Sequence, residues 1–277
     1  MTRLVREDIF EIEEKIGQYD QYFMSQTGKT MAQIARTAAG VTGEIVPYGV
    51  TVIPVTSGLG IISTFSESVA AILKHAGIHA VVSKRTDVAG IQEAYLSGRE
   101  IIFMADDDVF SAFGAGIRAQ SDNGDATGRG YMAALFAAME SRGIDPACKE
   151  VLILGAGPVG SAAADYAINH HVDTVIYDPF IDKAMKVAKM TGSRYLEDVP
   201  DYSKYPYIMD ASTEGDIIDV GDVTEETIIS AAGMPCAATR EARGKASVIH
   251  NPLELGVLTM YYQCLSQVEE SSLCQKM

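Results

Sequence analysis

The chain has 277 residues, of which 47% are hydrophobic, and its formal net charge is −15 at pH 7. This length suits two domains of ordinary size, and the apolar content is sufficient for complete hydrophobic cores. The acidic balance, with an isoelectric point near 4.7, argues against nucleic acid and membrane partners and favours a cationic small molecule.

Cysteine usage and the first residues of the chain indicate a cytoplasmic protein. The four cysteines show neither CxxC pairing nor metal-site spacing, so we expect reduced thiols and no metal centre. The acidic, amphipathic start MTRLVREDIFEIEEK has no apolar signal-peptide core, and no run of 18 apolar residues predicts a membrane span. A homodimer is compatible with all of these features.

The N-terminal part of the chain alternates helix and strand patterns after two leading helices, which predicts a parallel sheet. The expected elements are helices at 6–25 and 28–38, a strand at Thr51–Val55, a helix at about 65–76, a strand at His79–Val82, a helix at 88–97 and a strand at Ile101–Met104. Residues 105–130 are rich in Asp, Gly and Ser and are predicted to be loops.

The C-terminal part repeats the alternation of strand and helix patterns. A helix at about 130–142 precedes strands near 151–154, 174–177, 206–209, 227–230 and 247–249, and a helix at Leu253–Gln267 follows them. We therefore predict an α/β protein with two domains. Residues 1–130 form a smaller N-terminal α/β substrate lobe with leading helices, and residues 131–277 form a Rossmann-type parallel sheet with the C-terminal helix.

The most informative motif is a glycine-rich turn between a predicted buried strand, Val151–Leu154, and a predicted helix, 161–167. Its residues are Gly155, Ala156, Gly157, Pro158, Val159 and Gly160. This is the G-x-G-x-x-G pattern of dinucleotide-binding units, in which the glycines allow a tight turn, a close approach of the pyrophosphate, and close helix packing. The free N–H groups of the helix N-terminus attract the phosphates.

An acid after the second strand of this unit indicates which dinucleotide binds. Asp178 follows Gly160 by 18 residues, so its carboxylate is placed to accept hydrogen bonds from the adenine ribose. It would repel a 2′-phosphate, and no arginine follows it directly, which favours NAD over NADP. Further cofactor contacts are predicted where later strands end, at Ser212, Thr213, Pro235 and Cys236. Cys236 as a nucleophile and FAD as the cofactor are alternatives with less support.

Two segments of the first lobe follow predicted strands and are candidates for substrate binding. Thr56-Ser57-Gly58 combines hydroxyls with a helix start, which suits either a bound carboxylate or a simple helix cap. Ala105-Asp106-Asp107-Asp108 suits a substrate ammonium better than a metal ion, because its spacing matches no calcium loop. Asn123–Gly128 is either a plain turn or a loop that closes over the nicotinamide. His250, at the end of a predicted strand, is a further substrate contact.

The chain resembles the PylD family, the dehydrogenases that form pyrrolysine. The matching stretches cover both lobes, and they are PVTSGLGIISTFSESVAAI at 54–72, IIFMADDDVF at 101–110, GAGPVG at 155–160, GMPCA at 233–237 and NPLELGV at 251–257. The resemblance implies an NAD-dependent oxidation of the terminal amine of lysine that carries methyl-D-ornithine on its ε-nitrogen. Ammonia is released, and the resulting semialdehyde cyclises to pyrrolysine.

The same resemblance implies substrate contacts at Leu4, Ser57, Ala105 and Asp106. Where the family has a glutamate before the PLELG segment, this chain has Asn251, which cannot accept a proton. The proton acceptor is therefore unassigned, with His250, Glu254 and Asp106 as candidates, unless the substrate differs. The alternatives are an NAD-dependent dehydrogenase of another amino acid and a non-catalytic NAD-binding redox sensor.

Overall fold

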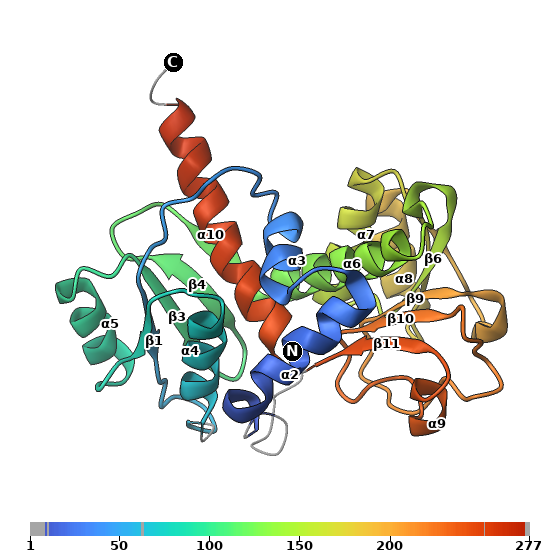
Figure 1. Ribbon diagram of the computed structural model, residues 1–277, viewed down its shortest axis with the longest axis horizontal. Helices are drawn as coiled ribbons and strands as arrows, with labels where there is room; N and C mark the ends of the chain where they lie inside the picture. Colours follow the sequence, from blue (N-terminus) through green and yellow to red (C-terminus); the bar gives the residue numbers. More distant parts are fainter. Residues whose placement is uncertain (1–8, 10, 62–63, 252, 275–277) are drawn as a thin grey trace. The chain divides into compact units, whose positions relative to one another are not determined.

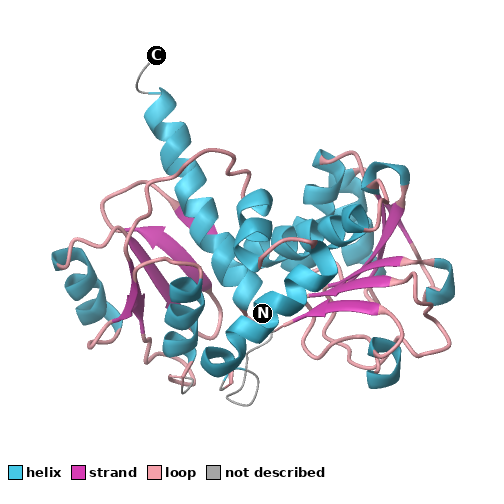
Figure 2. Cartoon of the chain, viewed as in Figure 1, coloured by secondary structure: helices cyan, strands magenta, loops and turns pink. Residues whose placement is uncertain are grey.

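The computed structural model describes residues 9, 11–61, 64–251 and 253–274, which form two compact units. Unit 1 comprises the described residues of Met1–Asp20, Met31–Ala126 and Pro252–Met277, and unit 2 comprises Gln21–Thr30 and Thr127–Asn251. Two helices are shared between the units, α2 (Ile12–Thr27) and α6 (Asn123–Ser141). Figure 1 labels many of these elements, and Figure 2 separates them into helices, strands and loops.

The sheet of unit 1 has five strands in the order β2-β1-β3-β4-β5. The strands are β1 (Val50–Ile53), β2 (Ala80–Val82), β3 (Ile101–Ala105), β4 (Phe110–Gly114) and β5 (Gln120–Asp122). The first three are parallel, as predicted, but β4 and β5 are antiparallel additions. The sheet is therefore mixed, and the segment that we predicted as loops contains two strands and the start of α6.

Helices cover both faces of this sheet. They are α3 (Met31–Ala38), α4 (Phe65–His75), α5 (Asp87–Leu96) and α10 (Glu254–Cys274). Ala94 of α5 packs with Ile53 and Ile102 on one face. On the other face α4 contacts β1 and β2, while α10 contacts β4, β5, α3 and α4 (Figure 1).

The placement of α10 differs from our prediction, which put it with the second lobe. By its packing it belongs to unit 1, where the Tyr261 hydroxyl donates to the carbonyl oxygen of Tyr48 at 3.2 Å and Arg36 of α3 stacks over the Tyr262 ring at 5.8 Å. The apolar pattern of a terminal helix shows that it is buried, but not which sheet it covers.

The sheet of unit 2 has six parallel strands in the order β11-β10-β9-β6-β7-β8. They are β6 (Glu150–Leu154), β7 (Asp173–Tyr177), β8 (Arg194–Tyr195), β9 (Tyr207–Asp210), β10 (Ile228–Ala231) and β11 (Ser247–His250). Counted from β6, this is the order 3-2-1-4-5-6 of a Rossmann sheet. The chain reverses its direction of travel across the sheet between β6 and β9, and ligands bind at such a switch point.

The two faces of this sheet are covered differently. α7 (Pro158–Asn169) and α8 (Ile181–Thr191) pack on one face. On the other face Leu152 and Leu154 pack with apolar residues of the segments that join β9, β10 and β11, among them Ile218 and Ala237. The described connections after β9 and β10 are mostly loops, and the α-helix that they contain, α9 (Arg240–Arg243), is short.

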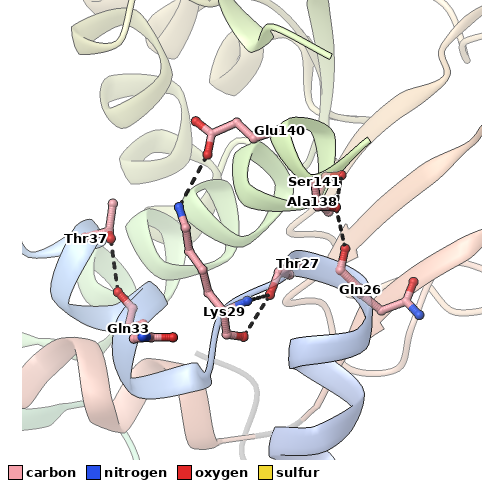
Figure 3. Close-up of polar contacts among 8 residues, drawn as sticks. All are labelled: Gln26, Thr27, Lys29, Gln33, Thr37, Ala138, Glu140 and Ser141. Atoms are coloured by element: carbon pink, nitrogen blue, oxygen red, sulfur yellow. Dashed lines mark hydrogen bonds and ion pairs between the residues drawn. The ribbon is translucent and has the colours of Figure 1, made fainter. Parts of the chain in front are cut away.

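The end of α2 is fastened to unit 2 by polar contacts. Lys29 forms an ion pair with Glu140 at 3.3 Å, and the Ser141 hydroxyl donates to the carbonyl oxygen of Gln26 at 3.1 Å (Figure 3). The Tyr22 hydroxyl donates to the carbonyl oxygen of Val248 in β11. These contacts explain why a short N-terminal segment belongs to unit 2.

Among the helices described, none has a stretch long and apolar enough to cross a membrane.

Candidate functional site

The glycine-rich turn, residues 155–160, joins β6 to α7 and is called the glycine loop below. Gly155 has φ +92°, and a Cβ there would lie 2.6 Å from the carbonyl oxygen of Ala211. A Cβ on Gly160 would lie 1.9 Å from the carbonyl oxygen of Gly155. Both positions therefore require glycine, one for its conformation and the other for close packing of α7 against the loop.

Gly157 is different, because a Cβ there would meet nothing within 4 Å. The outer side of the loop is thus open at the position where the motif lets a pyrophosphate approach the backbone. α7 begins at Pro158 without a side-chain cap, so its first N–H groups are available to a ligand. This cradle fits the diphosphate of a dinucleotide.

Asp178 ties the end of β7 to the glycine loop. Its Oδ2 accepts from the N–H of Ala156 at 2.8 Å, and its Oδ1 accepts from the N–H of Phe180 at 2.8 Å. The side chain is buried. A carboxylate has about four acceptor positions, so two remain for the ribose hydroxyls. The arrangement fits NAD, and it also gives Asp178 a structural role that the sequence did not reveal.

The loops after β9 and β10 contain the other predicted cofactor contacts. Thr213 and Pro235 are exposed, Ser212 is half-buried, and Cys236 is buried. Burial raises the pKa of the Cys236 thiol, which argues against its role as a nucleophile, because the thiolate is the reactive form. Asp210, which we did not select from the sequence, binds both loops through its fully buried carboxylate.

His250 and Asn251 lie at the end of β11. Nδ1 of His250 is 2.9 Å from the carbonyl oxygen of Ala231, and burial lowers the pKa of the imidazole. Asn251 is buried, and the Tyr131 hydroxyl donates to both its carbonyl oxygen and its side-chain Oδ1. Asn251 therefore contributes to the packing of α6 against β11, whatever else it binds.

In unit 1 the loop after β1, residues 54–60, is held by two carboxylates, one from the start of α5 and one from the turn after β3. Asp87, at the start of α5, accepts from the N–H and the hydroxyl of Thr56 at 2.8 and 2.7 Å. Asp107, after β3, accepts from the N–H of Leu59 at 2.7 Å. The structure thus brings together the two predicted substrate segments, and Ser57, in the first of them, is exposed.

Ala105 is the last residue of β3, and Asp106 begins the turn that leads to β4. Oδ1 of Asp106 accepts from the N–H groups of Asp108 and Val109 at 2.9 and 2.8 Å, and these bonds lower the pKa of the carboxyl. Asp106 is exposed and ionised, so its second oxygen is available to a cation. No group of three acids, histidines or cysteines in the described ranges is arranged to hold a metal ion.

Glu254, in the first turn of α10, is the most unusual acid of unit 1. It is fully buried, and desolvation raises the pKa of its carboxyl to about 7. Oε2 accepts from the N–H of Leu253 at 3.1 Å, whereas Oε1 has no hydrogen-bond partner among the described residues. A buried carboxyl with a free oxygen and a pKa near neutrality can accept a proton. Leu4, the remaining predicted substrate contact, lies outside the described residues.

Comparison with known sequences identifies relatives of the whole chain. The family model for the N-terminal domain of the pyrrolysine biosynthesis protein PylD matches residues 8–118. The pyrrolysine synthase of Methanosarcina acetivorans is 31% identical over 268 residues, which cover 96% of this chain and 100% of that protein. The pyrrolysine synthase of Methanosarcina barkeri is 30% identical over 268 residues, which cover 96% of this chain and 98% of that protein.

Comparison with solved structures identifies the fold. The quinate dehydrogenase of Corynebacterium glutamicum, solved in complex with NAD, superposes with a TM-score of 0.50. The match covers 83% of this chain and 100% of that chain at 15% sequence identity, so it shows a shared dehydrogenase fold.

Proposed function

Because this chain belongs to the PylD family of pyrrolysine synthases, we propose that it is an NAD-dependent dehydrogenase that completes pyrrolysine. Its substrate is lysine with methyl-D-ornithine on the ε-nitrogen, and it oxidises the carbon that bears the terminal amine. Hydrolysis of the imine releases ammonia, and the semialdehyde condenses with the ornithine α-amine to close the pyrroline ring with loss of water.

The observation that supports the cofactor best is the open cradle at Gly157, bounded by Gly155 and Gly160. A bound NAD would supply the hydride acceptor for the oxidation of the substrate carbon. The glycine loop and the N-terminus of α7 hold the diphosphate, and Asp178 takes the adenine ribose hydroxyls. A 2′-phosphate would approach the Asp178 carboxylate, so we assign NAD rather than NADP.

The loops after β1 and β3 suit a substrate that is cationic at one end and aliphatic elsewhere. Asp106 offers its carboxylate to an ammonium group. Leu59 and Val109 expose apolar side chains on the loops after β1 and β3, and Val88 does so in the first turn of α5 after β2. These segments follow parallel strands and therefore reach the same edge of the sheet. A long amino-acid side chain with terminal amines has this combination of properties.

The amine must be neutral when the hydride leaves, and we assign Glu254 as the proton acceptor. Its carboxyl has a pKa of about 7 and an oxygen without a hydrogen-bond partner. His250 is a weaker candidate, because burial lowers the pKa of its imidazole below the ordinary value and makes it a poorer base. Asn251 has no basic group.

The test uses the purified protein with NAD and synthetic lysine-Nε-methyl-D-ornithine. We expect formation of NADH, release of one ammonia per NADH, and a product with the mass of pyrrolysine. NADH formation with other amino acids but not with this substrate would replace the proposal by a different dehydrogenase activity. Binding of NAD without turnover of any amine would indicate a sensor instead.

A further inference from the structure

One buried carboxylate connects the two loops that follow β9 and β10. Oδ1 of Asp210 accepts from the N–H of Ser212 at 3.0 Å and from its hydroxyl at 2.7 Å, while Oδ2 accepts from the N–H of Ala237 at 2.9 Å. Residues 212 and 237 are 25 positions apart. Asp210 therefore determines how these loops lie relative to each other.

The surrounding backbone is shaped to admit this carboxylate. A Cβ on Gly233 would lie 2.8 Å from Oδ2 of Asp210, and a Cβ on Gly215 would lie 2.6 Å from Cγ of Pro235. The N–H groups of Ala232 and Gly233 also bind the carbonyl oxygen of Asp210, at 2.8 and 3.0 Å. The two loops are thus packed against each other around one acid.

Burial of a carboxylate costs free energy, so an acid with no role beyond packing is an expensive choice. An ionised carboxylate can only accept hydrogen bonds, and all three groups that face Asp210 are donors: two backbone N–H groups and the Ser212 hydroxyl. An asparagine of the same size would direct an NH₂ group at one of these donors. The site therefore requires the acid itself.

The position of the loops indicates what they serve. They follow β9 and β10, the strands of the second mononucleotide-binding half, and Ala211 packs on Gly155 at the switch point. In a Rossmann sheet the half that begins with the glycine loop takes the adenosine, and the other half takes the nicotinamide ribose.

We propose that Asp210 is a positioning residue that holds loops 211–216 and 232–237 in the arrangement that binds the nicotinamide–ribose half of NAD. This inference rests on the proposed NAD-dependent function. It predicts that loss of the carboxylate affects one half of the cofactor and spares the other.

The experiment measures the affinities of Asp210→Asn for NAD and for ADP, which lacks the nicotinamide and its ribose, by calorimetry. We expect the affinity for NAD to fall at least about 10-fold, as for the loss of a charged hydrogen-bond acceptor, and the affinity for ADP to stay within about 2-fold. Thr174→Val is the matched control, because Thr174 is a buried hydroxyl of β7 that contacts Ser193 rather than these loops. It should leave both affinities unchanged.

Equal losses for NAD and ADP would overturn the inference, because they would show a general defect of the fold, and unchanged NAD binding would overturn it as well. If Asp210→Asn does not fold, Ser212→Ala decides in its place, since it removes the hydroxyl that contacts Asp210 at 2.7 Å and the carbonyl oxygen of Glu214 at 3.4 Å, and it should weaken NAD selectively by a few-fold. If the unaltered protein binds NAD no more tightly than ADP, the nicotinamide half contributes no affinity and the inference fails. If it binds neither, the proposed cofactor itself is wrong.

Discussion

The two sheets bury acidic side chains to different extents at the edges where their parallel strands end. In unit 2, Asp178 and Asp210 are buried and accept hydrogen bonds from the loops around them. In unit 1, Asp87 and Asp107 also accept hydrogen bonds from a loop but are only half-buried, and Asp106 is exposed, with its Oδ1 accepting from its own turn. Unit 2 thus exposes backbone N–H groups, whereas unit 1 exposes negative charge.

This difference matches two kinds of ligand. Backbone donors at a helix N-terminus attract an anion such as a diphosphate, and an exposed carboxylate attracts an ammonium group. A dehydrogenase of a cationic amine needs both. We therefore expect substitutions in unit 2 to affect NAD binding and substitutions in unit 1 to affect use of the amine. Glu254 is the exception to this contrast, because it is a buried acid of unit 1, and its Oε1 has no hydrogen-bond partner among the described residues.

Glu254→Gln should have the largest effect on catalysis. Loss of a general base lowers the rate by about 100-fold or more, so kcat should fall by that factor while NAD affinity is retained. The kcat of the unaltered enzyme should rise with pH through about 7, as the carboxyl becomes ionised, and this rise should be absent in the variant. Asp106→Asn would instead act on KM. A pH profile unchanged by Glu254→Gln would exclude it as the proton acceptor.

The same substitution should stabilise the fold at high pH. The carboxyl binds its proton more tightly in the folded state, where its pKa is about 7 rather than 4.5. Proton binding by this carboxyl therefore stabilises the folded state fully below pH 4.5, and this stabilisation is lost as the pH rises through 7. In urea unfolding, the free energy of unfolding of Glu254→Gln should therefore increase relative to that of the unaltered protein between pH 4.5 and 8, by up to about 3 kcal/mol. A gain independent of pH would contradict the assigned cause.

Gly157→Ala should separate cofactor binding from folding in unit 2. A Cβ there meets nothing within 4 Å in the protein, so stability should stay the same, but the methyl group would occupy the approach of the diphosphate. We expect NAD affinity to fall by about 10- to 100-fold, as for 1–3 kcal/mol of overpacking. Gly160→Ala is the contrasting variant, because its Cβ would collide with Gly155 and lower the melting temperature. An equal decrease in melting temperature for both variants would contradict the separate roles assigned to Gly157 and Gly160.

The strand–turn–helix of unit 2 was predictable because its glycines act locally. Gly155 needs a left-handed conformation and Gly160 needs close packing, and both requirements leave a visible pattern in the sequence. The hairpin of β4 and β5 was missed because β5 is a short polar strand and because acids, serine and glycine in and around β4 resemble a loop, although β4 pairs with β3 and with β5. Pairing between strands overrides such local preferences.

The candidate site residues also divide into those with a local sequence pattern and those that depend on contacts between distant segments. Asp178 was selected as a cofactor contact because one βαβ unit sets its distance from Gly160, and the structure places it directly after β7, in contact with the glycine loop. Asp210 was missed because its partners Ser212 and Ala237 come from two loops that only the fold brings together. The burial of Glu254 was equally hidden, since the first turn of a helix usually exposes its acids. Side chains whose role depends on distant contacts leave no local signal.

Asp106→Asn tests the exposed charge of unit 1 and should have a moderate effect. Asparagine keeps the Oδ1 that accepts from Asp108 and Val109, so the turn should stay intact and only the charge is lost. We expect kcat/KM for the amine to fall about 10-fold with NAD affinity unchanged, as for the loss of one charged hydrogen bond. Asp108→Asn is the control, because its side chain holds no comparable turn. Equal effects of both variants would show that only the overall charge of the loop matters.

Asp178→Ala should have the smallest effect, because it removes one ribose contact and leaves the diphosphate cradle. The lost hydrogen bonds to the ribose and to Ala156 predict a several-fold decrease in NAD affinity. Asp178→Asn separates the two roles, since its Oδ1 can still bind one loop N–H while the negative charge is gone. If the charge excludes NADP, the ratio of NAD to NADP affinity should fall in both variants, whereas a purely structural Asp178 would weaken NAD and leave that ratio unchanged. Calorimetry with the two cofactors measures the ratio directly, so the acid nearest the glycine loop can be assigned either to cofactor choice or to loop packing.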